Sequence, residues 1–115
     1  MVLVKGRNVS SATDLARQTI RNLIELGISD FVISPGSRNA PLSIALNEAK
    51  SHGIIELHIK LDERGAAFYA LGIAKATDKH VAVICTSGTA AANFHPALLE
   101  AWHGSNKLIA ITADR

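Results

Sequence analysis

The stretch FVISPGSRNAPLSIALNEA, residues 31–49, contains the pattern from which the fold follows. Its first three residues are apolar and form a run short enough for a buried strand, which the turn Ser34-Pro35-Gly36 ends. Pro41 then suits the first turn of a helix, because a proline there loses no helical hydrogen bond. Apolar residues at helical spacing continue to Ala49, and Gly53 ends the helix. The stretch is therefore predicted to run from a buried strand through a polar turn into a helix.

The same alternation of strand and helix extends in both directions along the chain. Upstream, Ser10, Ser11 and Asp14 can cap a helix whose apolar positions continue until Gly27. The remaining predicted strands cover residues 55–61, 81–85 and 108–112, and the remaining helices cover 66–76 and 90–102. A helix followed by four strands with helices between them predicts an α/β fold of three layers, α/β/α, with a mainly parallel sheet in the middle.

Length and composition are those of one globular domain. The chain has 115 residues, of which 48% are hydrophobic and 19% charged, and this excludes disorder, collagen and coiled coil. The scattered charges leave a net charge of only +2, so we expect no nucleic-acid partner. Lys5 interrupts the short apolar start, and no run approaches the roughly 20 apolar residues of a membrane span, so we expect neither a signal peptide nor a span. A single cysteine, Cys85, suits the cytoplasm.

Four polar clusters follow the four predicted strands. They are Ser34-Pro35-Gly36-Ser37-Arg38, Asp62-Glu63-Arg64-Gly65, Thr86-Ser87-Gly88-Thr89 and Ala113-Asp114-Arg115. The carboxyl ends of parallel strands meet at one edge of a sheet, and ligands of such sheets bind just beyond that edge. The sequence therefore predicts that the four clusters converge on one rim.

Each cluster has an ordinary structural interpretation beside a functional one. Gly36 permits close approach to the backbone and Arg38 offers donors for a carboxylate or phosphate, but a turn between strand and helix also explains the glycine. We expect Asp62 to cap the next helix, whereas Glu63 either joins a surface salt bridge or holds a proton in a pocket. Arg115 is either solvated or reaches an anion bound at the rim.

The turn from Thr86 to Thr89 leads into an alanine-rich segment that contains Asn93. Tight packing of helix on sheet explains the alanines, whereas the hydroxyls and the Asn93 amide are better explained by a ligand. The sequence contains neither GxxxxGK[ST] nor GxGxxG. Its five histidines lack the spacing of zinc ligands, and we expect them at surface or capping positions.

Taken together and in order, these motifs resemble the N-terminal pyrimidine-binding domain of thiamin-diphosphate-dependent enzymes. The resemblance runs from about residue 12 to residue 115 and includes the small-residue helix around residues 70–75. The strand, the acidic turn and the Thr-Ser-Gly turn are shared by the whole superfamily. The SPGSR, DERG and TADR forms are more specific, and they are similar to those of its members that act in menaquinone biosynthesis.

The resemblance implies an activity, cofactors and partners. The activity is that of a transferase, a carboligase that decarboxylates 2-oxoglutarate and adds the succinyl unit to isochorismate. The cofactors are thiamin diphosphate and Mg²⁺ or Mn²⁺. Residues 1–115 would be the N-terminal part of the pyrimidine domain, with the metal ligands and the other domains elsewhere. The enzyme would be a cytoplasmic homodimer or dimer of dimers with its site between two subunits, and the fragment alone would be inactive.

The resemblance also implies roles for single residues. Glu63 matches the glutamate that hydrogen-bonds the aminopyrimidine ring nitrogen, and it is the predicted catalytic residue. The positions that match contacts to the cofactor's pyrimidine side are Gly36, Thr86, Thr89 and Asn93. The positions that match the substrate side are Ser37, Arg38 and Arg115, and arginines suit substrates that carry several carboxylates.

Two alternatives stay open on the sequence. The first is another thiamin-diphosphate enzyme, such as a decarboxylase or acetohydroxyacid synthase, against which Arg38 and Arg64 argue. The second is a small-ligand binding module without chemistry, which the short chain favours. An apolar strand at the end of the chain, with no helix to cover it, instead predicts that the domain continues.

Overall fold

The computed structural model describes residues 11–114. Ser10, predicted as part of a helix cap, and Arg115, predicted at the substrate side, lie outside these residues. In chain order the elements are α1 (Ala12–Glu25), β1 (Asp30–Ile33), the 3-10 helix η1 (Ser37–Asn39), α2 (Ala40–Ser51), β2 (Glu56–Ile59), α3 (Glu63–Thr77), β3 (Val81–Cys85), α4 (Thr89–Ala92), α5 (His95–Gly104) and β4 (Leu108–Thr112).

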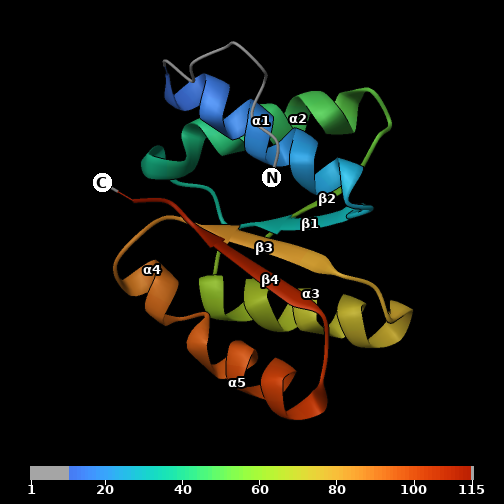
Figure 1. Ribbon diagram of the computed structural model, residues 1–115. Helices are drawn as coiled ribbons and strands as arrows, with labels where there is room; N and C mark the ends of the chain where they lie inside the picture. The colour runs from blue at the N-terminus through green and yellow to red at the C-terminus, as the bar shows by residue number, and fades with distance from the viewer. Residues whose placement is uncertain (1–10, 115) are drawn as a thin grey trace.

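The four strands form one parallel sheet in the order β2-β1-β3-β4. Phe31 in β1 lies opposite Leu57 in β2 and Ala82 in β3, which fixes the register of the three strands. Helices α1 and α2 cover one face of the sheet, and α3, α4 and α5 cover the other (Figure 1). The predicted three-layer α/β fold is therefore confirmed.

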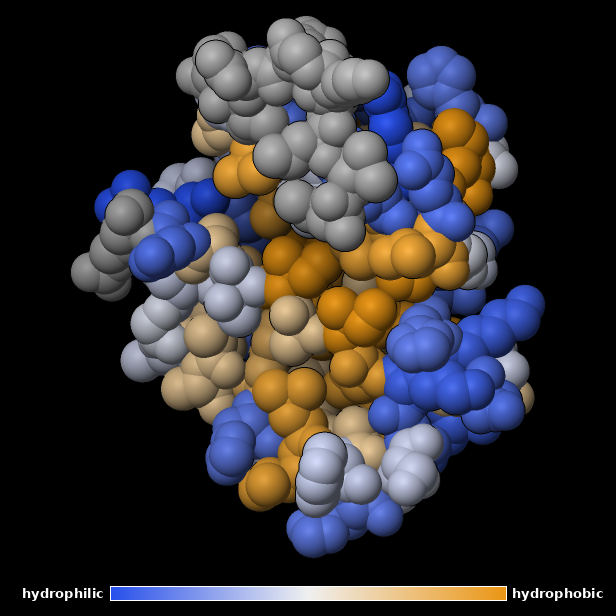
Figure 2. Space-filling view, viewed as in Figure 1, coloured by the Kyte–Doolittle hydropathy of each residue, from blue (hydrophilic) through white to orange (hydrophobic). Residues whose placement is uncertain are grey.

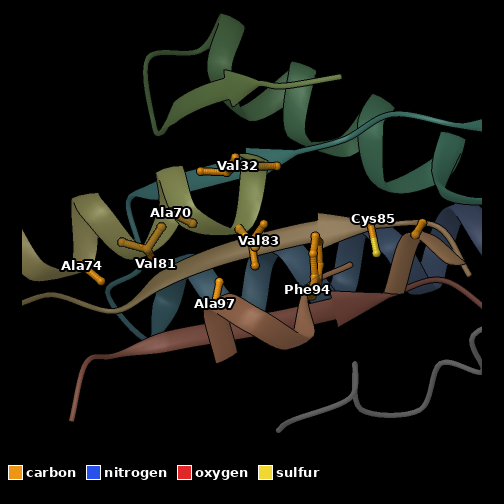
Figure 3. Packing of buried hydrophobic residues seen from close by; sticks show 11 residues of the cluster. Val32, Ala70, Ala74, Val81, Val83, Cys85, Phe94 and Ala97 are labelled. Carbon is orange, nitrogen blue, oxygen red and sulfur yellow. The ribbon is translucent and has the colours of Figure 1, made fainter. Parts of the chain in front are cut away.

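Alternating side chains of the strands build a separate core on each face. Phe31 and Ile33 of β1 pack on the α1 and α2 side, whereas Val32 between them packs on the α3 side. On that second side the alanines of α3 lie against Val83 and Cys85 of β3 (Figure 3). Because alanine is small, the α3 backbone lies close to the sheet, and its first turn is held beneath the ends of β1 and β3.

Two predicted helix caps are present. The Ser11 hydroxyl accepts a hydrogen bond from the Asp14 backbone N–H at 3.1 Å, and the Asp62 carboxylate accepts one from the Gly65 N–H at 2.7 Å. Such caps satisfy N–H groups that the first turn of a helix leaves free. The second cap matters for the site, because it fixes where Glu63 begins α3.

The single helix predicted over residues 90–102 is wrong. The structure has α4 (Thr89–Ala92) and then α5 (His95–Gly104), with a break at Asn93 and Phe94. Phe94 is only 1% exposed and belongs to the core beneath β3. Pro96 lies in the first turn of α5, where its missing N–H costs nothing, so a new helix begins at that point instead of continuing the old one.

Strand β4 lies at one edge of the sheet, and none of its five residues is fully buried. Figure 2 shows apolar surface gathered over this part of the molecule. None of the helices within residues 11–114 has the length and apolarity that a membrane crossing requires.

Candidate functional site

The loops that follow the four strands lie at one edge of the sheet, because all four strands point the same way. The loops after β1 and β3 come close together at Gly36. A Cβ atom added to Gly36 would come within 2.6 Å of the Thr86 Cγ2 atom, a distance that real Cβ contacts essentially never show. Gly36 therefore leaves room for the Thr86 methyl group in its present position, which any other residue would displace.

Asn39 holds the loop between Ser34 and α2 in one shape. Its side chain is fully buried, its Oδ1 atom accepts a hydrogen bond from the Gly36 N–H at 2.9 Å, and its Nδ2 group donates to the Ser34 carbonyl at 2.9 Å. One amide thus pairs with the backbone on both sides of Pro35. Ser37 and Arg38, between Gly36 and Asn39, are exposed.

Glu63 is the first residue of α3, and its side chain is partly buried. Ala66 and Ala67, one turn further on, are fully buried in the same cluster as Val32 and Cys85. Glu63 therefore lies at the level where β1 and β3 end. Within residues 11–114 its carboxyl group has no hydrogen bond or ion pair, so the surface salt bridge considered from the sequence is not formed by the described residues. It remains free to bind a ligand.

Cys85 is the last residue of β3, and the charge of the Glu63 carboxyl group reaches its thiol. Its side chain is fully buried, and the Sγ–H group donates to the Thr86 carbonyl at 3.3 Å. Burial, reinforced by the negative charge of Glu63, raises the pKa of the Cys85 thiol to about 11. The thiol is therefore neutral at physiological pH and does not act as a nucleophile.

We expect the Cys85 thiol of the folded protein to ionise only as the pH approaches about 11, because burial disfavours the thiolate. The folded-state pKa lies above that of an unfolded cysteine, so this group's contribution to stability is fully present below about pH 9 and is lost as pH rises toward 11. The ultraviolet absorbance of the thiolate, followed against pH as the difference between wild type and Cys85→Ser, tests this without a reagent that must reach the buried sulfur. The same difference titration in denaturant is the control, and ionisation that is complete near pH 9 in the folded protein contradicts the expectation.

Arg38 lies on the other side of the sheet edge from Glu63. It lines a pocket of about 350 Å³ together with Pro41 and Leu42 from α2, residues of α1, and the end of β4 from Ile111 to Asp114. The structure thus brings the first and fourth polar clusters together on the α1 and α2 side. Glu63 belongs to the α3 side, and the contact between Gly36 and Thr86 lies between the first and third clusters.

Thr89 and Asn93 are both exposed and mark the two ends of α4. The Asn93 Nδ2 group donates to the Thr89 carbonyl at 2.8 Å, which leaves its Oδ1 atom as the group open to a ligand. Asn93 therefore lies beside Thr89, the last residue of the third cluster. The Asn93 amide, which is predicted to contact the cofactor, already uses its Nδ2 group for this hydrogen bond.

Sequence reasoning gave no separate role to Ser34, a member of the first cluster, or to Asn39, which directly follows that cluster, and both are buried polar residues. The position of Asn39, three residues after the Pro35-Gly36 turn, was a signal in the sequence that its side chain binds the loop, because asparagine side chains often hydrogen-bond to nearby backbone groups. His58 also differs from the expected surface or capping position, since it is partly buried and its Nε2 atom lies 3.1 Å from Asp30 Oδ1. Among residues 11–114, no three His, Cys, Asp or Glu side chains are placed to hold a metal ion.

A parallel sheet with glycine, hydroxyl and carboxyl groups at the carboxyl ends of its strands belongs to the class of α/β domains that bind ligands at this edge. Comparison with known proteins specifies the family. The sequence profile "Thiamine pyrophosphate enzyme, N-terminal TPP binding domain" matches residues 13–115, and thiamine pyrophosphate is thiamin diphosphate under its other name. The chain belongs to this family.

Within the family, the chain is similar to several proteins of one kind. It is 50% identical over 105 residues to the 2-succinyl-5-enolpyruvyl-6-hydroxy-3-cyclohexene-1-carboxylate synthase of Nocardioides sp., and this covers 91% of the chain and 19% of that protein. The synthase of the same name from Lysinibacillus sphaericus is 48% identical over 103 residues, or 90% of the chain and 18% of that protein. The chain therefore spans about a fifth of the length of the curated relatives it matches.

Proposed function

We propose that the protein containing this chain is a 2-succinyl-5-enolpyruvyl-6-hydroxy-3-cyclohexene-1-carboxylate synthase of menaquinone biosynthesis. It would decarboxylate 2-oxoglutarate and transfer the succinyl unit to isochorismate. The observation that carries the proposal is the free, partly buried Glu63 carboxyl group at the carboxyl edge of a thiamine pyrophosphate enzyme fold. The identity of about 50% to synthases of that name supports the choice of reaction.

The residues at this edge fit the pyrimidine half of thiamin diphosphate. Glu63 offers a carboxyl group without a partner among the described residues, and a ring nitrogen is a suitable one. When bound, the cofactor supplies the electron sink that lets a 2-oxo acid lose carbon dioxide and form a new carbon–carbon bond. Glu63 would hold and move a proton at the aminopyrimidine ring nitrogen. The groups that would contact the pyrimidine side are Gly36, Thr86, Thr89 and Asn93.

The substrate side would lie around the exposed part of the first cluster. Ser37 and Arg38 lie between Gly36 and Asn39, which one hydrogen bond joins, so their backbone positions are defined although they are exposed. A guanidinium group binds a carboxylate through two parallel hydrogen bonds, and both proposed substrates carry carboxylates. Arg115, which follows Asp114 in the sequence, would add a second guanidinium group for the substrate carboxylates.

The rest of the assignment concerns parts of the protein beyond the described residues. Residues 1–115 would form the N-terminal part of the pyrimidine-binding domain, and Mg²⁺ or Mn²⁺ would be held by another domain. The protein would be a cytoplasmic homodimer or dimer of dimers, in which the pyrimidine domain of one subunit faces the diphosphate domain of the other. The apolar, partly exposed edge strand β4 is consistent with further structure packing against this sheet.

Substrate preference tests the proposal directly. We would measure 2-oxo acid consumption by the full-length protein with thiamin diphosphate and Mg²⁺, in the presence and absence of isochorismate. We expect 2-oxoglutarate consumption that depends on isochorismate. Consumption of pyruvate instead would move the protein to a sister family with the same cofactor, and no turnover of either acid by folded protein would favour a binding module.

A further inference from the structure

Ser34, at the end of β1, has a buried hydroxyl group with no hydrogen-bond partner in the described part of the chain. The residue is only 3% exposed. Its backbone is fully engaged, because the N–H donates to the Ile84 carbonyl at 2.9 Å and the carbonyl accepts from Asn39 Nδ2 at 2.9 Å. The backbone is thus fixed and only the hydroxyl is unused. A buried polar group without a partner is costly, and in native proteins it calls for a specific explanation.

The hydroxyl lies on the α3 side of the sheet. Side chains alternate along a strand, and Val32, two residues earlier, packs with α3. Ile33 pairs in register with Ile84, so Ser34 continues the register next to Cys85. Cys85 belongs to the same α3-side cluster. Ser34 and Cys85 are therefore neighbours on the face that α3 covers.

Glu63 begins α3 beside these two residues. The chain leaves β2 next to the end of β1, where the Lys60 N–H donates to the Ile33 carbonyl at 3.0 Å, and it enters α3 three residues later. Ala66 and Ala67 belong to the same buried cluster as Val32 and Cys85, and Glu63 lies one helical turn before them. The negative charge of Glu63 contributes to the raised pKa of the neighbouring Cys85 thiol. A hydroxyl donor without an acceptor and a carboxyl group without a donor thus belong to the same face and the same edge of the sheet.

Building on the proposed function, we propose that Ser34 is a positioning residue whose hydroxyl donates a hydrogen bond to the Glu63 carboxyl group when the cofactor is bound. The bond holds that carboxyl group toward the aminopyrimidine ring nitrogen. In the described structure the two groups are not bonded, so the bond forms on loading and contributes to cofactor affinity. The Ser34 hydroxyl group then has no hydrogen-bond partner in the free protein. Removing this hydroxyl should therefore leave the stability of the free protein unchanged or raise it, and should weaken cofactor binding.

The test uses the full-length protein with Ser34→Ala, Ser34→Thr and, as matched control, Ser29→Ala at the exposed opposite end of β1. We would measure the unfolding midpoint without cofactor and the Kd of thiamin diphosphate with Mg²⁺ by calorimetry. For Ser34→Ala we expect an unchanged or higher midpoint, because an unsatisfied buried hydroxyl is removed, and a Kd about tenfold weaker, as for one hydrogen bond to a charged group. Ser34→Thr keeps the hydroxyl and should restore the Kd, and Ser29→Ala should change neither quantity.

The outcomes separate this inference from the proposed function. If wild type does not bind thiamin diphosphate, the proposed function is wrong and the role of Ser34 falls with it. If wild type binds and Ser34→Ala binds equally well, only the role of Ser34 is overturned. A lower midpoint for Ser34→Ala without cofactor, with no recovery of the Kd in Ser34→Thr, indicates a purely structural serine and also overturns it.

Discussion

Replacement of Glu63 by glutamine in the full-length protein is expected to slow 2-oxoglutarate consumption by on the order of 10²–10⁴, the usual contribution of a general acid–base group. Glutamine has nearly the same size and still hydrogen-bonds, but its amide cannot supply a proton to the ring nitrogen. The residue begins α3 and follows the Asp62 cap, so the substitution leaves the anchoring hydrogen bond to Gly65 in place. We therefore expect a change in kcat rather than loss of the fold.

Glu56→Gln is the matched control for this experiment. Glu56 is an exposed carboxylate at the first residue of β2, at the opposite end of the strand that leads to Glu63. Initial rates with thiamin diphosphate, Mg²⁺ and isochorismate should be unchanged in Glu56→Gln. Rates of Glu63→Gln close to wild type, with the cofactor shown to be bound, would remove Glu63 from the catalytic role and leave the fold assignment intact.

The parts of the fold that local pattern determines were predictable. Strand β3 was predicted at its observed bounds, Val81–Cys85, because a strand buried on both faces must be apolar throughout. Strand β2 is shorter than the predicted 55–61, since an edge strand pairs only where β1 lies beside it. The break at Asn93 and Phe94 had a signal in the sequence, because Pro96 lies inside the predicted span and a helix usually ends before a proline. The burial of Phe94 in the core beneath β3 is the part that spacing along the chain did not indicate.

The candidate site was predictable in its residue types and in its edge of the sheet, but not in its internal arrangement. Parallel strands bring all four polar clusters to one edge, and this follows from the alternation of strand and helix. Arg38 lies on the α1 and α2 side of the sheet and Glu63 on the α3 side. The spacing of the motifs along the chain does not specify which face of the sheet each helix covers. Ser34 was missed because its surroundings come from a neighbouring strand and from α3.

Asn39→Ala is expected to have the largest effect on stability of any single change at this edge. It removes both hydrogen bonds that the buried amide makes to the backbone, to the Gly36 N–H and to the Ser34 carbonyl. The Ser34 carbonyl is left buried without a partner, which costs about 1–3 kcal/mol, and the part-buried Gly36 N–H loses a hydrogen bond worth about 0.5–1.5 kcal/mol. The expected loss of unfolding free energy is therefore about 1.5–4.5 kcal/mol. The loop would also lose the hydrogen bond that joins position 39 to Gly36 across Ser37 and Arg38, so activity should fall together with stability.

Amide hydrogen exchange locates this effect within the protein. In full-length Asn39→Ala, exchange at residues 34–40 should accelerate far more than in β3, because the lost bonds belong to the loop and not to the sheet. Asn47→Ala, an exposed asparagine on the same helix α2, is the control and should leave both exchange and stability unchanged. If Asn39→Ala costs no more stability than Asn47→Ala, the loop is held by its Pro-Gly turn alone. The defined position of Arg38 would then have to come from the bound substrate, and not from the chain.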